Sequence, residues 1–136
     1  MHSSFKKLAL KSCLSLTLVF AIVGIVAGLN ASAKYKIITG AYQSLTLATF
    51  GSSGDYELHV QGMNLNTNHS ATMTTKLRRG NTYGSSTVIK THSKSCSYGQ
   101  TSDILKEDDS CRYYWGSSTQ TYAGYSETKY GSLPVQ

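Results

Sequence analysis

Three histidines in the region after residue 33 offer nitrogen atoms that could bind a metal ion or transfer a proton. His59 and His92 lie in stretches with strand-like patterns, and His69 lies in a polar turn. No two of them have the i, i+2 or i, i+4 spacing that places metal ligands on one face of a strand or helix. We therefore expect solvated histidines, no metal site and no cofactor.

Motifs for a catalytic nucleophile or a calcium loop are also absent from the sequence. Serine and threonine are abundant, but there is no Gly-x-Ser-x-Gly turn of the kind that exposes a reactive serine. The acidic residues between positions 103 and 109 lack the alternating carboxylates of a calcium loop and include Lys106. We expect a protein that is not an enzyme, with solvated acidic side chains in this segment.

Aromatic residues gather in the last third of the chain and are the main candidates for recognition. Tyrosine joins a flat apolar ring to a hydroxyl group, a combination suited to sugar stacking and protein recognition. Some of these rings must fill the core, and we expect Trp115 to pack there. We predict that Arg112, Tyr114 and Tyr125 point outward and form a possible binding surface. The aromatic residues in this group are Tyr113, Tyr114, Trp115, Tyr122, Tyr125 and Tyr130.

Two cysteines, Cys96 and Cys111, follow residue 33. They lack the C-x-x-C spacing of redox and metal pairs, and no histidine is near them in sequence. In an oxidising compartment they should be joined, and a closed loop of this length would stabilise the fold by about 3 kcal/mol. We predict one structural disulfide on which Trp115 packs. The polar segment between the cysteines should form a surface loop with a helical turn near 103–105.

The N-terminus has the three parts of a secretion signal. Three lysines within residues 6–11 precede an apolar stretch from Leu14 to Leu29, and small residues at Ala31 and Ala33 suit cleavage before Lys34. The apolar stretch falls short of the roughly 20 residues of a membrane-spanning helix. We therefore predict a helical signal peptide over residues 1–33 that is removed, with a retained membrane anchor as the alternative. Contact with the membrane would end at cleavage.

The charge balance changes once the signal peptide is removed. The whole chain has 13 basic and 7 acidic residues, and three of the basic ones precede Ala33. The mature chain would therefore carry a net charge of only +3. Only Arg78 and Arg79 are adjacent, and no reading motif for nucleic acid accompanies them, so we expect no nucleic-acid partner.

Residues 34–136 form one domain, which the pattern of side chains predicts to be all-β. Apolar residues alternate with polar ones between turns rich in Gly, Asn and Ser, as in the runs 42–50, 56–65 and 71–79. Apolar side chains change parity near Gln61–Gly62 and near Gly124, where we predict β-bulges. The expected fold is a small antiparallel β-sandwich of about six to seven strands with one disulfide.

These features favour a small secreted, non-enzymatic protein that binds a cell-surface, glycan or protein target outside the cell. A first alternative is a secreted antimicrobial or toxin-like protein of bacterial type, because a small cationic chain is attracted to anionic envelopes. A second alternative is a secreted enzyme inhibitor, in which the loop between the cysteines would enter an enzyme cleft. The target, the organism and the oligomeric state do not follow from the sequence.

Overall fold

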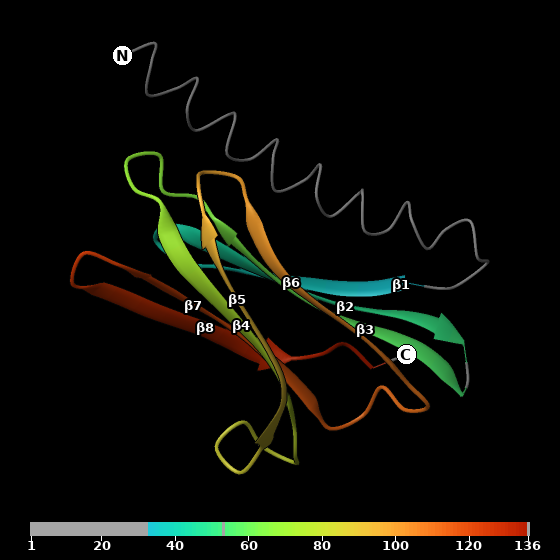
Figure 1. Cartoon of the computed structure of the whole chain (residues 1–136). Helices are drawn as coiled ribbons and strands as arrows, with labels where there is room; N and C mark the ends of the chain where they lie inside the picture. Colours follow the sequence, from blue (N-terminus) through green and yellow to red (C-terminus); the bar gives the residue numbers. More distant parts are fainter. Residues whose placement is uncertain (1–32, 53, 136) are drawn as a thin grey trace.

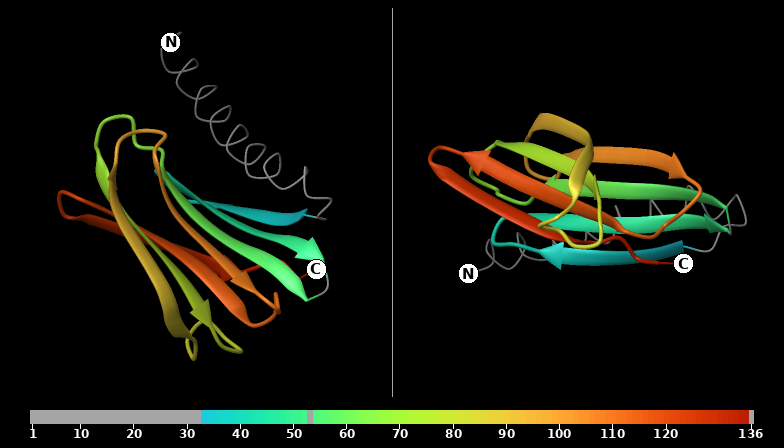
Figure 2. Two further views of the ribbon diagram at one scale, coloured as in Figure 1. Left: turned by 45° about the vertical axis from the view of Figure 1, so that its right-hand side comes forward. Right: turned by 90° about the horizontal axis from the view of Figure 1, so that it is seen from below.

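The computed structural model describes residues 33–52 and 54–135, and it confirms an all-β sandwich. Eight antiparallel strands form two four-stranded sheets that pack face to face (Figures 1 and 2). The strands are β1 (Ala33–Thr39), β2 (Gln43–Ser52), β3 (Asp55–Asn64), β4 (Ala71–Arg79), β5 (Thr87–Cys96), β6 (Thr101–Asp108), β7 (Tyr114–Tyr122) and β8 (Tyr125–Ser132). The described residues thus form eight strands, rather than the six to seven expected.

The predicted signal peptide lies outside the described residues, apart from its last position. Ala33 and Lys34, which flank the predicted cleavage point, are the first two residues of β1. Within the described part of the chain, no helix is long and apolar enough to cross a membrane.

The two sheets are built from hairpins that alternate between the layers. Sheet A has the order β1-β2-β3-β6, and sheet B has the order β5-β4-β7-β8. The chain passes from sheet A to sheet B between β3 and β4, returns with β6, and ends in sheet B with the β7–β8 hairpin (Figure 1). After β8 the C-terminal tail lies beside β1, where Lys34 Nζ donates to the backbone oxygen of Val135 at 2.9 Å.

One half of the space between the sheets is filled with aliphatic side chains. Leu47 pairs with Val60, and Val60 pairs with Ile104, so these three residues form a row on the inner face of sheet A. Gly116 lies opposite them in sheet B, where a Cβ atom would come within 2.3 Å of Leu47 Cδ2. The close approach of the two sheets therefore requires glycine at this position.

The other half of the interior contains many polar side chains, several of them joined by hydrogen bonds, beside the small apolar cluster of Ala71, Met73 and Cys96. Thr75 Oγ1 lies 3.0 Å from Ser102 Oγ, and Gln120 Nε2 donates to Asn64 Oδ1 at 2.7 Å. All four side chains are completely buried. Because buried polar groups are tolerated where they have hydrogen-bond partners, this chain fills a sandwich with few aliphatic residues.

Both predicted β-bulges are absent. Strand β3 keeps a continuous register with both of its neighbours through Gln61 and Gly62, so Met63 points to the face opposite Val60. The parity change near Gly124 is a turn that joins β7 to β8. A register shift occurs instead between Leu77 and Arg78, opposite β5.

The segment between the two cysteines is also different from the prediction. Residues 101–108 form strand β6 at the edge of sheet A, rather than a surface loop with a helical turn. Its side chains alternate between buried Ser102 and Ile104 and exposed Asp103 and Leu105. Only one face of this strand is buried, so its other face carries polar and acidic residues. These residues made the segment resemble a loop in the sequence.

The predicted disulfide between Cys96 and Cys111 is not seen. Cys96 pairs with Ala71 at one end of β4, whereas Cys111 comes three residues before Tyr114, the partner of Arg79 at the other end. The eight steps from one end of β4 to the other span about 26 Å. A disulfide needs Cα atoms less than about 7 Å apart, so this fold keeps the two cysteines in separate buried clusters.

Candidate functional site: the outer face of sheet B

The side chains of sheet B that point away from sheet A form the candidate site, called here the outer face of sheet B. Met73, Thr75 and Leu77 of β4 are buried between the sheets, so the alternate residues Thr72, Thr74, Lys76 and Arg78 point outward. Residues paired with these four on β5 and β7, and the partners of the β7 residues on β8, lie on the same face, so the surface covers all four strands.

Two consecutive rows of the outer face consist entirely of Ser and Thr. Thr74 Oγ1 lies 2.9 Å from Ser93 Oγ, and Thr119 Oγ1 lies 2.8 Å from Thr128 Oγ1, so hydroxyl groups bond to one another along the second row. Hydroxyl groups thus repeat about every 4.8 Å across the strands and about every 6.7 Å along them. The first row is Ser95, Thr72, Thr121 and Ser126, and the second is Ser93, Thr74, Thr119 and Thr128.

An aromatic cluster with one arginine lies at one end of the outer face. Tyr83, in the loop between β4 and β5, stacks on Tyr130 of β8 with ring centroids 4.0 Å apart and an interplanar angle of 15°. The ring of Trp115 meets Tyr83 edge-on at 6.2 Å. The Arg78 guanidinium lies 4.9 Å from the centre of the Tyr83 ring. We call Arg78, Tyr83, Trp115 and Tyr130 the aromatic cluster.

Hydrogen bonds to the loop between β4 and β5 hold the aromatic cluster in place. Arg78 donates through Nε to Ser86 Oγ at 2.8 Å and through Nη2 to the Ser86 backbone oxygen at 3.0 Å. Trp115 Nε1 donates to the Gly80 backbone oxygen at 3.0 Å. The rings are therefore ordered before any ligand binds, which lowers the entropic cost of binding. Tyr130 remains 52% exposed.

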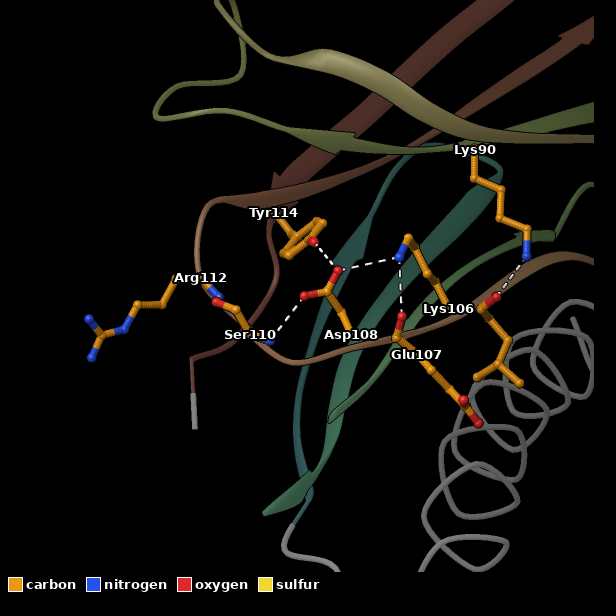
Figure 3. A network of polar contacts seen from close by, with 8 residues as sticks. Lys90, Lys106, Glu107, Asp108, Ser110, Arg112 and Tyr114 are labelled. Atoms are coloured by element: carbon orange, nitrogen blue, oxygen red, sulfur yellow. Dashed lines mark hydrogen bonds and ion pairs between the residues drawn. The ribbon is translucent and has the colours of Figure 1, made fainter. Parts of the chain in front are cut away.

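The three residues of the predicted binding surface do not come together. Arg112 is exposed and, in Figure 3, points away from its neighbours. Tyr125 lies at the β7–β8 turn, and Tyr114 lies at the opposite end of β7. Tyr114 is only 2% exposed, so its predicted outward position is wrong. Trp115 takes the outward position instead, and it contacts Tyr83 rather than a disulfide.

Tyr114 belongs to a partly buried polar network that joins the two sheets (Figure 3). Its hydroxyl donates a short hydrogen bond to the Asp108 carboxylate, which also accepts from Lys106 Nζ and the Ser110 backbone. Burial and the bond to Asp108 raise the pKa of Tyr114 to about 12. Burial alone would raise the pKa of Asp108, but the three hydrogen bonds and the Lys106 charge outweigh it and lower this pKa. The network is therefore structural.

A second group of rings lies at the other end of the sandwich and includes Tyr125. The rings of His69, Tyr122 and Tyr125 stack in sequence with centroids 4.9 Å apart at each step, and Tyr42 meets Tyr125 edge-on. Tyr125 also donates to Glu127 Oε2 at 3.2 Å. Tyr125 thus contacts residues of its own hairpin and of nearby loops. These contacts stabilise this end of the sandwich.

The histidines are separate from one another. His59 contacts Phe50 on sheet A, His69 stacks on Tyr122, and His92 Nδ1 lies 2.7 Å from Ser102 Oγ. Burial lowers the pKa of His59, although the nearby Glu57 carboxylate opposes this effect. Among residues 33–52 and 54–135, no three His, Cys, Asp or Glu side chains are grouped so that they could hold a metal ion.

No similarity to a known protein indicates what this site does. No protein family, no curated protein and no solved structure matches the chain. The alternation over residues 71–79 predicted Lys76 and Arg78 on the outward face of their strand, and the structure places them there. Neither they nor Tyr83 were predicted to form a binding surface. The alternation of Thr at 72 and 74 and at 119 and 121 is the signal in the sequence that could have located this face.

Proposed function

We propose that this chain is a small secreted, non-enzymatic protein that binds an extracellular glycan or cell-wall polymer through the outer face of sheet B. The observation that carries the proposal is the union of two hydroxyl rows with the aromatic cluster on one face. Hydroxyl groups exchange hydrogen bonds with sugar or polyol hydroxyls, and flat rings pack on the apolar faces of sugars. An open, regular sheet face suits an extended polymer better than a small molecule, which needs a concave site.

Secretion is the other half of the proposal, and it rests on the three-part N-terminus described above. Export would bring the mature domain into contact with polymers outside the membrane. The aromatic cluster is consistent with such a role because its neighbouring rings form one apolar patch, in which Tyr130 is 52% exposed to a ligand.

The alternatives carry less support from the geometry. The inhibitor hypothesis depended on an exposed loop between the cysteines, and residues 101–108 form strand β6 instead. The antimicrobial hypothesis predicts killing in addition to binding. A growth assay with the purified mature protein therefore distinguishes an antimicrobial protein from a binding protein.

The test is co-sedimentation of residues 34–136 with isolated cell walls and with insoluble polysaccharides. Tyr130→Ala should reduce the bound fraction severalfold, because it removes the exposed ring of the aromatic cluster. Tyr35→Ala is the matched control, since Tyr35 is 54% exposed but lies on β1 of sheet A. Equal binding by the two variants, with both folded by circular dichroism, would refute the outer face of sheet B as the binding surface.

A further inference from the structure

The two sheets of the sandwich differ in charge. The strands of sheet B carry six basic residues and one acidic residue, whereas those of sheet A carry three basic and five acidic residues. The net charge is therefore +5 on the strands of sheet B and −2 on those of sheet A. The positive charge thus lies on the layer that presents the hydroxyl rows. Of its six basic residues, Lys76 and Arg78 have the parity of the outer face, and the other four have the parity of the inner face.

Cations are placed within the outer face of sheet B itself. The third row across the sheet is Thr91, Lys76, Ser117 and Tyr130, and the fourth includes Arg78 and Trp115. Lys76 therefore lies between the hydroxyl rows and the aromatic cluster. The Lys76 ammonium can donate to an anionic oxygen that approaches from outside.

The strands of sheet B, all within the described residues, place no carboxylate on the outer face to compete for these cations. Glu127, the one acidic residue in the strands of sheet B, pairs with Gln120 and has the parity of the inner face. Its carboxylate accepts from Gln43 Nε2 at 3.0 Å and from the Ala41 backbone, and these bonds lower its pKa against the opposing effect of burial. Its negative charge thus faces the turn between β1 and β2 and the start of β2 in sheet A.

We propose that the ligand of the outer face is a polyanionic glycan or polyol, whose phosphate, sulfate or carboxylate groups lie over Lys76 and Arg78. This inference rests on the proposed function and specifies the chemical class of its ligand. The hydroxyl rows bind the uncharged part of the repeat, and the rings pack on its carbon atoms. Charge complementarity selects an anionic polymer over a neutral one.

The experiment compares dextran sulfate with dextran of the same chain length, by titration calorimetry on the mature protein. We expect dextran sulfate to bind at least tenfold more tightly than dextran, and its affinity to fall as salt rises. Lys76→Gln should weaken this binding by about two- to fivefold. Lys34→Gln is the matched control, because it removes one charge from sheet A and gives the same net charge.

Each outcome decides one of the two proposals. Equal binding of dextran and dextran sulfate would overturn the anionic ligand and leave glycan binding intact. Equal losses in Lys76→Gln and Lys34→Gln would overturn the assignment to the outer face, since net charge alone would then explain the attraction. Duplex DNA bound as tightly as dextran sulfate would also overturn the inference, because DNA shares only the charge. If neither dextran binds, the anionic ligand fails, and the cell-wall sedimentation above decides the proposed function separately.

Discussion

Tyr83 and Tyr130 stack face to face although one lies in the loop between β4 and β5 and the other lies on β8 at the far edge of sheet B. The loop must therefore reach across β4 and β7 to place the Tyr83 ring. Trp115 of β7 lies beneath this path and contacts Tyr83 edge-on. The stack joins a loop to a strand from another hairpin. Its rings therefore stabilise the fold in addition to forming part of the proposed binding surface.

Tyr83→Ala should destabilise the domain and loosen the loop between β4 and β5. Aromatic pairs contribute about 0.5–1.5 kcal/mol beyond their buried area, and Tyr83 contacts two rings. We expect a loss of about 1–2 kcal/mol in the free energy of unfolding, measured by urea denaturation. Tyr83→Phe keeps the ring and is the control. A loss of the same size in Tyr83→Phe would show that the stack is not the source of the effect.

The fold class could be predicted from the sequence, and particular strands could not. Alternation of apolar and polar residues identified β2 and β4 because one face of each contributes leucine or methionine to the core. Strand β6 was missed because its inward residues include Ser102, which is buried through a hydrogen bond to Thr75 rather than through hydrophobicity. A polar core weakens the pattern on which such predictions depend.

The candidate site was harder to predict than the fold, because side-chain direction depends on register. Tyr114 and Trp115 are adjacent, and a shift of one residue exchanges which ring is buried. The sequence offers no reason to bury Tyr114, since its partner Asp108 lies on another sheet. Likewise, an expected oxidising compartment and the presence of only two cysteines after residue 33 favoured a disulfide between Cys96 and Cys111, whereas strand β4 places them at its opposite ends.

Tyr114→Phe should destabilise the protein while keeping its ring packed. The change removes the hydroxyl that donates to Asp108 and leaves that carboxylate with fewer donors in a half-buried position. Removal of one partner from such a hydrogen bond costs about 1–3 kcal/mol. Urea denaturation at neutral pH measures the loss. In an Asp108→Asn background the same substitution should cost less, and an unchanged cost would contradict the pairing.

Alkaline pH should weaken the contribution of Tyr114. Its pKa rises from an ordinary value near 10 to about 12 in the folded protein, so the folded state retains a proton that the unfolded state releases between these values. The stabilisation is complete below about pH 10 and is lost as the pH rises towards 12. Two pKa units correspond to about 3 kcal/mol. The stability difference between wild type and Tyr114→Phe, followed from pH 8 to 12, should shrink over this window, and a constant difference would contradict it.

Gly116→Ala should be strongly destabilising because the new Cβ would collide with the core. It would lie 2.3 Å from Leu47 Cδ2 and within 3.0 Å of both Val60 methyl groups. Overpacking of this kind costs about 1–3 kcal/mol. Gly84→Ala is the matched control, since its Cβ would meet nothing within 4 Å. Thermal denaturation should separate the two variants, and similar midpoints would show that the sheets can move apart without cost.

The two cysteines should remain unlinked to each other in the folded protein. Cys96 lies with Ala71 and Met73 in a small buried cluster, about the length of β4 from Cys111. Burial also raises the pKa of the Cys96 thiol, which lowers the fraction of reactive thiolate. We expect peptide mapping without reductant to find no Cys96–Cys111 cross-link. Recovery of a Cys96–Cys111 cross-linked peptide from folded protein would contradict the arrangement of sheet B, because β4 separates the two cysteines.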